Sequence, residues 1–343
     1  MQLIKQNTKI NFLGKQKIGF TISILLILLS ITSLVINKGP NYGIDFVGGT
    51  IIQIKFLQKV PISQIRLGLS RIGLKDLSVQ NFGNDKENEF LIRANNVDMT
   101  SQNLSSSIAL AIKETTKMDS EIRRIEMVGP QVGKDLRAKA LLAIFYSLLF
   151  ITIYISGRFE LKWALSAITA GALMTVVYFL SVLNMSMAIL IGSALVITLI
   201  LFWFLRLKYA MGAIVALLHD VMITIGIFSI FNLDFSLPII AALLTIIGYS
   251  LNDTIIVFDR IRENTKGVKT KESFFALINK SINETLSRTI LTSATTLMVL
   301  FTLYFFGGEI IHNFAFAMII GVIIGTYSSI FVASPVLLAA HER

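Results

Sequence analysis

Long apolar runs recur along the chain and are interrupted by one polar stretch. The first run covers 18–36, and a polar stretch of about 100 residues follows it. Seven more runs come after that stretch, at 138–155, 163–183, 187–205, 213–231, 235–258, 289–306 and 314–338. A helix of about 20 apolar residues is long enough to cross a bilayer. The pattern therefore predicts eight membrane-spanning helices, with 138–338 as a transmembrane bundle.

The polar stretch, 37–137, has the alternating pattern of a small α+β domain. Strands are predicted at 50–57, 77–83, 89–94 and 121–129, and helices at 63–72 and 101–116. The turn-rich residues 84–88 are predicted to close a hairpin. The order β-α-β-β-α-β is that of the ferredoxin-like fold, which by itself does not indicate a function.

The distribution of Lys and Arg predicts which loops face the cytoplasm. Basic residues precede the first span and recur in alternate short loops, at Lys5, Lys9, Lys15, Lys17, Arg158, Lys162, Arg206 and Lys208. The remaining short turns, 184–186, 232–234 and 307–313, contain neither Lys nor Arg. By the positive-inside rule, 1–17 and 339–343 are predicted to be cytoplasmic tails, and 37–137 is predicted to lie outside.

A basic connector, 259–288, joins two predicted spans. Phe274, Ile278, Ile282 and Leu286 recur in it at every fourth position among charged residues. This spacing predicts an amphipathic helix lying at the cytoplasmic face. A surface helix that simply leads into the next span fits the same pattern.

The composition agrees with a membrane protein. Of 343 residues, 54% are hydrophobic and 15% are charged, whereas soluble domains carry about 25% charged residues. The net charge of +10 sits in the loops, so we interpret it as a topology signal beside anionic lipid rather than as a nucleic-acid-binding surface. The absence of cysteine excludes thiol chemistry and disulfides.

Motifs for nucleotide, metal or hydrolase chemistry are missing from the chain. It contains no Walker A sequence, no H-E-x-x-H, no G-x-S-x-G and no dinucleotide fingerprint. The sequence therefore predicts no cofactor, no metal and no ATP hydrolysis. If the protein performs work, we expect the energy to come from an ion gradient.

Asp253 is the strongest candidate for chemistry, because a charge inside a membrane span is costly and is usually functional. Arg288 opens the next span at a depth that Asp253 could match. We interpret Asp253 as a carboxylate that binds and releases a proton as its distance from Arg288 changes. Asn252 and Thr254 are candidate hydrogen-bond partners. A static Asp–Arg pair that fixes helix packing is the structural alternative.

His219 and Asp220 form a second candidate, near the middle of the run 213–231. They could act as a further relay element or as a neutral, hydrogen-bonded packing pair. Small residues are expected to allow close helix approach; they are Gly248, Ser250, Gly321 and Gly325.

Several long segments resemble the SecF family of protein-export membrane subunits. "NYGIDFVGGT" (41–50) is similar to the family signature and contributes Gly43, Asp45, Gly48 and Gly49. Further similarity covers 128–136, 213–231, 241–264, 282–297 and 307–337. The resemblance therefore extends over most of the chain apart from 156–205 and the interior of the polar domain.

The resemblance implies a polytopic α-helical membrane protein with an RND-like bundle and a periplasmic α+β domain. It implies an inner-membrane subunit that couples proton flow to late preprotein export together with SecD and the SecYEG translocon, with YajC and YidC as further partners. By position in the family motifs, Asp253 and Arg288 are implicated in proton passage. No nucleic acid is implied.

The chain departs from the family between 163 and 205, where two spans are predicted in excess of the family's six. Similar segments at 158–168 and 206–214 indicate a partial internal duplication. The stretch from Trp163 to Leu205 has no ionisable residue, which favours a lipid-facing or scaffolding hairpin over a functional one.

Two other functions are compatible with parts of the pattern. An RND-like, proton-driven exporter of a small molecule or lipid would also need a partner to complete its bundle. An intramembrane aspartic protease would use Asp220 and Asp253 as a dyad. That dyad must share a proton, and Arg288 would discourage such sharing by favouring the ionised form.

Overall fold

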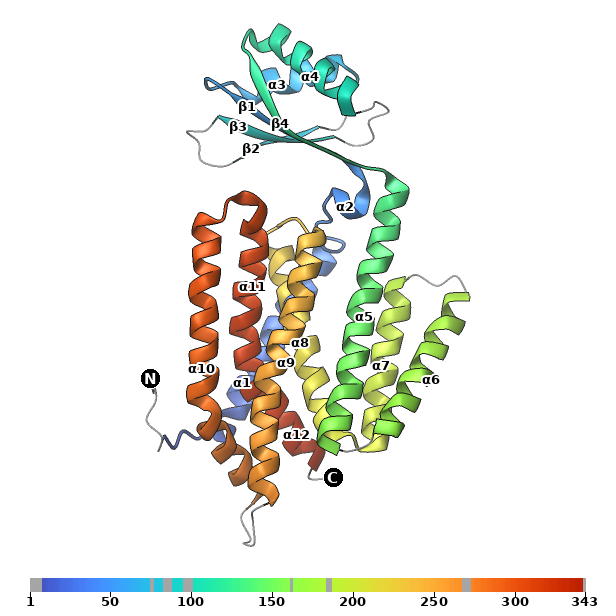
Figure 1. Cartoon of the computed structure of the whole chain (residues 1–343), viewed down its shortest axis with the longest axis vertical. Coiled ribbons are helices and arrows are strands. Elements are labelled where there is room, and N and C mark those ends of the chain that lie inside the picture. Colours follow the sequence, from blue (N-terminus) through green and yellow to red (C-terminus); the bar gives the residue numbers. More distant parts are fainter. Residues whose placement is uncertain are drawn as a thin grey trace. The chain divides into compact units, whose positions relative to one another are not determined.

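The computed structural model describes residues 8–74, 77–82, 88–94, 101–160, 163–182, 187–266 and 273–341. These residues form two compact units (Figure 1). The sheet domain is Tyr42–Lys139, and the helical unit is Met1–Asn41 together with Ala140–Arg343. Of the turn predicted at 84–88, residues 84–87 lie outside the described part of the chain.

The sheet domain has the predicted order of elements. Its elements are α2 (Ile44–Val47), β1 (Gly49–Phe56), α3 (Ile62–Arg71), β2 (Ser78–Phe82), β3 (Glu89–Ala94), α4 (Ser101–Thr116) and β4 (Ser120–Val128). The strands pair antiparallel in the order β2-β3-β1-β4. The predicted β-α-β-β-α-β order is confirmed, whereas the ferredoxin-like assignment stays a prediction. The short helix α2 was not predicted.

The core of the sheet domain lies between the sheet and the two helices α3 and α4. Every second residue of β1 is buried, and Ile52 and Ile54 are fully inaccessible. They pack with Ile65 and Leu69 of α3 and with apolar residues of α4. The alternation that predicted the strands is therefore the alternation between this core and the opposite face of the sheet.

One carboxylate is buried within the sheet. Glu89, at the start of β3, accepts a hydrogen bond from Gln53 Nε2 at 2.9 Å. Arg123 Nη1 of β4 lies 2.5 Å from Glu89 Oε1, and Lys55 Nζ lies 3.6 Å from the same oxygen. Glu89 thereby connects β3 with β1 and β4, and the burial of its charge is offset by its cationic partners.

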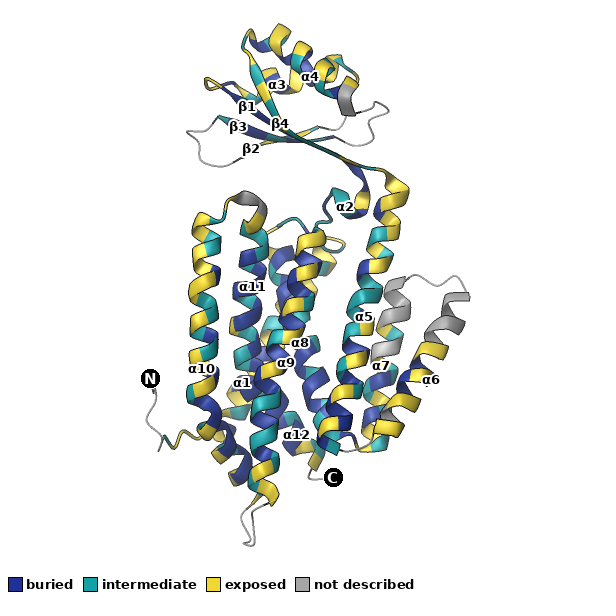
Figure 2. Ribbon diagram, in the orientation of Figure 1, coloured by how far each residue is buried: buried dark blue, intermediate teal, exposed yellow. Residues whose placement is uncertain are grey.

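The helical unit is an all-α bundle. Its elements are η1 (Leu13–Lys15), α1 (Gln16–Ile36), α5 (Pro130–Glu160, which begins in the sheet domain), α6 (Trp163–Val182), α7 (Met187–Leu205), α8 (Lys208–Ile230), α9 (Leu237–Lys266), α10 (Phe274–Phe306), α11 (Glu309–Ser328), the π-helical η2 (Ser329–Ala333) and α12 (Ser334–His341). Figure 2 shows α8 at its buried centre, with exposed faces on α6 and α10.

Within the described residues, six helical segments are long and apolar enough to cross a membrane. They are Leu13–Ile36, Pro130–Glu160, Lys208–Ile230, Leu237–Lys266, Phe274–Phe306 and Ile311–His341. The predicted hairpin 163–205 forms α6 and α7, of 20 and 19 residues. It packs on α5 through a small cluster that includes Phe145, Leu149 and Leu173. Whether α6 and α7 cross a membrane, giving eight spans, stays a prediction.

The connector differs from its prediction. Residues 259–266 continue α9, and α10 begins at Phe274 and runs unbroken to Phe306, so the described residues of the connector belong to these two long helices. The apolar spacing predicted the buried face correctly, because Ile278, Ile282 and Leu286 pack into the helical unit. The amphipathic pattern therefore corresponds to a helix face that packs against other helices of the unit, and not to a face that lies on a membrane surface.

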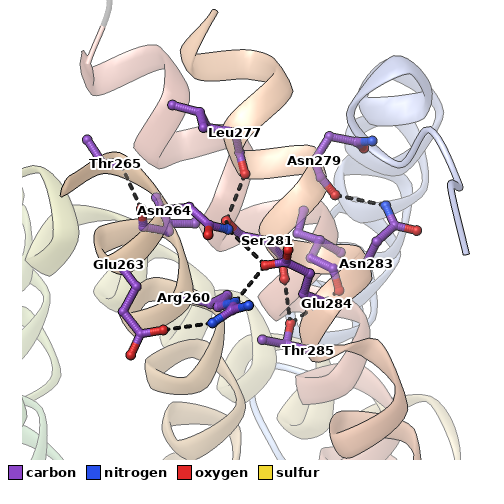
Figure 3. Close-up of polar contacts among 12 residues, drawn as sticks. Arg260, Glu263, Asn264, Thr265, Leu277, Asn279, Ser281, Asn283, Glu284 and Thr285 are labelled. Atoms are coloured by element: carbon purple, nitrogen blue, oxygen red, sulfur yellow. Dashed lines mark hydrogen bonds and ion pairs between the residues drawn. The ribbon is translucent and has the colours of Figure 1, made fainter. Parts of the chain in front are cut away.

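The facing ends of α9 and α10 are joined by polar contacts (Figure 3). Glu284 Oε2 accepts hydrogen bonds from Arg260 Nε at 2.6 Å and from Asn264 Nδ2 at 2.9 Å. Asn264 Nδ2 also donates to Ser281 Oγ at 2.9 Å. These contacts hold the last turns of α9 and the first turns of α10 side by side.

The chain just before η1 is held by two asparagines of α10. Asn279 Oδ1 accepts from the backbone N–H groups of Phe12 and Leu13, at 2.8 and 3.2 Å. Asn283 Oδ1 accepts from Ile10 N at 2.8 Å, and both amide groups donate to Ile10 O. The start of α1 is therefore fixed by α10, more than 260 positions away in sequence.

Candidate functional site

The centre of the helical unit contains the His219–Asp220 pair of α8. His219 is 4% exposed and Asp220 is 0% exposed. His219 Nδ1 lies 2.9 Å from Asp220 Oδ1, and His219 Nε2 lies 3.0 Å from Ser23 Oγ of α1. The imidazole thus bridges a carboxyl group and a hydroxyl, so either ring nitrogen can carry the proton of a neutral ring.

The other carboxyl oxygen of Asp220 is bound by two serines. Ser250 Oγ of α9 donates to Asp220 Oδ2 at 2.5 Å, and Ser328 Oγ of α11 donates to it at 2.8 Å. Three helices therefore meet at this carboxyl group. A buried carboxylate needs such donors to offset its lost hydration, and Asp220 has them.

The far end of the same chain of hydrogen bonds is Tyr327 of α11. Its hydroxyl donates to Gly19 O of α1 at 2.6 Å and lies 3.1 Å from Ser23 Oγ. The Tyr327 ring also stacks on the His219 ring, with centroids 6.1 Å apart. The series Tyr327–Ser23–His219–Asp220 thus crosses between α1, α8 and α11 without a gap.

Asp253 of α9 is fully buried but has few partners. Its Oδ1 has no hydrogen-bond partner among the described residues. Its Oδ2 receives a long contact of 3.5 Å from Thr326 Oγ1 of α11, and the hydroxyl of Ser293 of α10 also acts on this carboxyl group. The Thr326 hydroxyl has one proton and lies closer to Val322 O, at 2.8 Å. Few donors therefore stabilise a negative charge on Asp253.

Both carboxyl groups depend on one stretch of α11. Thr326 contacts Asp253 and bonds Ser293 of α10 at 2.7 Å, whereas Ser328 donates to Asp220. This stretch lies directly before the π-helical turn η2. Such turns interrupt the regular hydrogen-bond ladder and are frequent at functional sites. A shift of α11 would change the surroundings of both carboxyl groups together.

Close helix approach around this stretch depends on two of the predicted glycines. A Cβ on Gly325 would lie 2.9 Å from Ser250 Cβ, and one on Gly321 would lie 2.3 Å from Ile246 Cγ1. Gly248 behaves otherwise, because a Cβ there would meet no atom within 4 Å. The prediction is confirmed for Gly321 and Gly325 and wrong for Gly248, which faces away from the helix contact.

The other predicted partners of Asp253 do not bind it here. Arg288 is exposed and forms no direct ion pair with Asp253 in the described part of the chain, although its charge acts on Asp253 from a distance. Asn252 is exposed, about 100° around α9 from Asp253. Thr254 is buried, but no hydrogen bond joins it to Asp253 among the described residues, so neither neighbour serves as the predicted partner.

The site residues that the sequence analysis did not identify all carry a hydroxyl group. They are Ser23, Ser293, Thr326, Tyr327 and Ser328. Isolated hydroxyl residues are common in membrane helices, so composition does not distinguish these from others. The cluster Thr326–Ser329, four consecutive hydroxyl residues in an apolar run, is the one signal that could have indicated them.

The family signature lies in the sheet domain rather than among these helices. Gly43 precedes α2, which contains Asp45. Gly48 and Gly49 have φ values of 85° and 130°, in the region that favours glycine. A Cβ on Gly48 would lie 2.8 Å from Pro130 Cα at the start of α5. This signature forms a tight backbone contact between the start of β1 and the start of α5.

The described residues contain no group of three or more His, Asp or Glu side chains arranged to hold a metal ion. The hydrogen bonds of Asp220 go to His219, Ser250 and Ser328, while Asp253 contacts Thr326. No described contact joins the two carboxyl groups, as a shared-proton protease dyad would require.

Comparison with known proteins connects this arrangement to a family. The chain matches the model for the C-terminal part of the protein export membrane proteins SecD and SecF over residues 108–189 and 182–343. It matches the model for the SecD/SecF GG motif over residues 33–60, which contain the signature glycines. The two segments of the first match overlap at 182–189, within the predicted extra hairpin 163–205.

Curated relatives are similar over nearly their whole length. Protein translocase subunit SecF of Calditerrivibrio nitroreducens is 41% identical over 337 residues, which cover 97% of this chain and 95% of the relative. The SecF subunit of Desulfurispirillum indicum is 42% identical over 341 residues, covering 97% and 92%.

A solved structure shares the fold. The crystal structure of SecDF, a translocon-associated membrane protein from Thermus thermophilus, superposes with a TM-score of 0.75 at 31% identity. The match covers 100% of this chain and 40% of the SecDF chain. The chain described here therefore corresponds to less than half of that larger protein.

Proposed function

Since this chain belongs to the SecF family of protein translocase subunits, we propose that it couples proton flow across the bacterial inner membrane to late steps of preprotein export. The observation that supports this proposal best is Asp253, a fully buried carboxyl group with one oxygen lacking any described hydrogen-bond partner. A group of this kind inside a membrane span binds and releases a proton more readily than one fixed by donors.

The hydroxyl groups around the two carboxyl groups support a path for the proton. Ser293 and Thr326 adjoin Asp253, and the series Tyr327–Ser23–His219–Asp220 lies on the next helices. Arg288, exposed and at a distance in this conformation, would approach Asp253 in another state and favour release of the proton. His219 and Asp220, which have several hydrogen bonds, would either relay the proton or hold the helices in place.

A separate SecD subunit is the partner that we propose. The solved SecDF chain is matched over 40% of its length, so its remaining part would be supplied here by another polypeptide. SecYEG, unfolded preprotein and the accessory proteins YajC and YidC are proposed as further partners because of family membership alone. In this arrangement 1–17 and 339–343 lie in the cytoplasm, and 37–137 lies in the periplasm.

The test is gradient-dependent export by membrane vesicles that carry Asp253→Asn. We expect assembly with SecD to be normal and the gradient-dependent part of export to be lost, because an amide cannot release a proton. Asn252→Ser is the matched control, since the side chain of Asn252, next to Asp253 in the sequence, is exposed. Export that keeps its full gradient dependence in Asp253→Asn would overturn the proposed role.

A further inference from the structure

The predicted hairpin creates a cavity that the proposed function does not use. Five helices line it, and the lining residues are Gln16, Lys17, Phe20, Leu199, Ile200, Trp203, Phe204, Met211, Val215, Phe275, Pro335, Val336, Leu338, Ala339 and Ala340. Its volume is about 850 Å³. These residues come from α1, α7, α8, α12 and the first turn of α10, so without α7 the cavity would lose one wall.

A smaller cavity adjoins the first at the turn between α7 and α8. It has a volume of about 280 Å³ and shares Trp203, Phe204 and Met211 with its larger neighbour. Arg206 and Lys208 also line it. Together the two cavities form what we call the α7–α8 groove, an apolar channel in which Lys17 lines the larger cavity and Arg206 and Lys208 line the smaller one.

The charges at the groove carry one sign. Lys17, Arg206 and Lys208 contribute cations, and no Asp or Glu is among the residues that line either cavity. None of the three cations forms an ion pair with another described residue; Lys208 Nζ lies 3.5 Å from His341 Nδ1. Unpaired cations beside an apolar channel match a ligand with an anionic head and an apolar tail.

The backbone conformation of Arg206 also favours a ligand with an anionic head. Arg206 has a φ of 54°, a conformation that glycine adopts without cost and that costs other residues about 1 kcal/mol. The tight turn from α7 to α8 therefore has an arginine where backbone geometry favours glycine. Trp203, 49% exposed one turn earlier, is the side chain that membrane proteins place at the headgroup level.

We propose that the α7–α8 groove binds an anionic phospholipid, with an acyl chain along the apolar wall and the phosphate at Lys17, Arg206 and Lys208. The predicted topology puts these cations on the cytoplasmic side, where anionic lipids attract basic residues. The size of the cavity is within the range of ligand pockets, roughly 300–1,000 Å³. This site makes the hairpin a lipid-binding element and does not depend on proton coupling.

The chain contains two tryptophans, which permit a direct test in the intact protein. The full-length Trp163→Phe variant retains Trp203 in the groove as the fluorophore. The full-length Trp203→Phe variant retains Trp163, which is 52% exposed at the start of α6 and does not line the groove. Each variant is reconstituted in phosphatidylcholine vesicles with increasing amounts of phosphatidylglycerol or phosphatidylcholine whose acyl chains carry bromine, a quencher of tryptophan fluorescence.

We expect brominated phosphatidylglycerol to quench Trp203 at a lower mole fraction than brominated phosphatidylcholine, and Trp163 to show no such preference. Adding Arg206→Gln and Lys208→Gln should reduce the preference by roughly five-fold for each cation removed. Lys15→Gln, a neighbouring cation that does not line the groove, should leave it unchanged. Inorganic phosphate in the buffer should not compete, because the acyl chain supplies part of the binding.

Three results would overturn the proposal. Equal quenching of Trp203 by the two lipids would show that the groove does not select anionic lipid. Loss of the preference in the presence of millimolar phosphate would assign the cations to a free anion. Absence of quenching by either lipid would mean that a protein segment fills the groove. Both single-tryptophan proteins retain all three cations. The comparison of Trp203 quenching with Trp163 quenching therefore tests the proposal even if the charge variants fold poorly.

Discussion

Asp220 and Asp253 are both fully buried on the contacting helices α8 and α9, but their carboxyl groups are stabilised very differently. Asp220 is bonded by His219, Ser250 and Ser328. Asp253 has one long contact with Thr326 and an oxygen with no described partner. The first arrangement holds three helices together, and the second leaves a carboxyl group that can change its protonation without breaking a network.

This difference predicts opposite effects on stability. Asp220→Leu should lower the free energy of unfolding by about 2–3 kcal/mol, because it leaves His219, Ser250 and Ser328 without their partner. Asp253→Leu should cost less than about 1 kcal/mol, since only weak contacts with Thr326 and Ser293 are lost. Thermal unfolding in detergent micelles measures both. Equal shifts in melting temperature would contradict the assignment of Asp220 as the structural carboxyl group.

Substitution of Arg288 should affect export without affecting the free energy of unfolding. Arg288→Gln removes an exposed side chain with no direct ion pair to Asp253, so the free energy of unfolding should change by no more than about 0.5 kcal/mol. If Arg288 approaches Asp253 in another state, gradient-dependent export should nevertheless fall sharply. Arg288→Lys, which keeps the charge, should restore part of it. Full export by Arg288→Gln would remove Arg288 from the mechanism.

Gly325 should not tolerate a side chain. Gly325→Val would place its Cβ 2.9 Å from Ser250 Cβ, pushing α11 away from α9 and disturbing the bond between Ser250 and Asp220. We expect a destabilisation of about 1–3 kcal/mol. Gly248→Ala on α9 is the control, because a Cβ there meets nothing within 4 Å. It should be neutral or stabilise the helix by about 0.5–1 kcal/mol. Circular dichroism during heating distinguishes the two outcomes.

The α10 asparagines should control the order of the chain before α1. Asn279→Leu together with Asn283→Leu removes every hydrogen bond that these side chains make with Ile10, Phe12 and Leu13. At about 1 kcal/mol for each bond, amide hydrogen exchange at these backbone positions should accelerate roughly ten-fold or more. Mass spectrometry of the exchanged protein measures this. Unchanged exchange would mean that packing of Leu13, rather than the asparagines, orders this segment.

Gly48 should be required for the sheet domain. Gly48→Ala imposes a side chain on a residue with φ of 85° and brings its Cβ within 2.8 Å of Pro130 Cα. We expect more than about 1–2 kcal/mol of destabilisation. Gly129→Ala is the matched control, since a Cβ there would meet nothing within 4 Å. Limited proteolysis of the full-length protein should release fragments of the sheet domain sooner in Gly48→Ala than in Gly129→Ala.

The positions of the elements could be predicted because they follow from local patterns. Period-two alternation predicted β1 and β3 to within a residue, since one face of the sheet is buried. Runs of apolar residues predicted the long helices, because a helix in lipid satisfies its own backbone hydrogen bonds. The connector was predicted less well. Its apolar spacing specifies a covered face, but local pattern does not say whether protein or membrane covers it.

The sequence by itself determined that Asp220 and Asp253 would be buried, because any carboxyl group within such a long apolar run must enter the bundle. Only the tertiary structure decided which residues they meet. A helix turns by about 100° per residue, so Asn252 is exposed while Asp253 beside it is buried. Ser23 and Tyr327 meet across 304 positions, a contact that depends on helix packing and leaves no local signal.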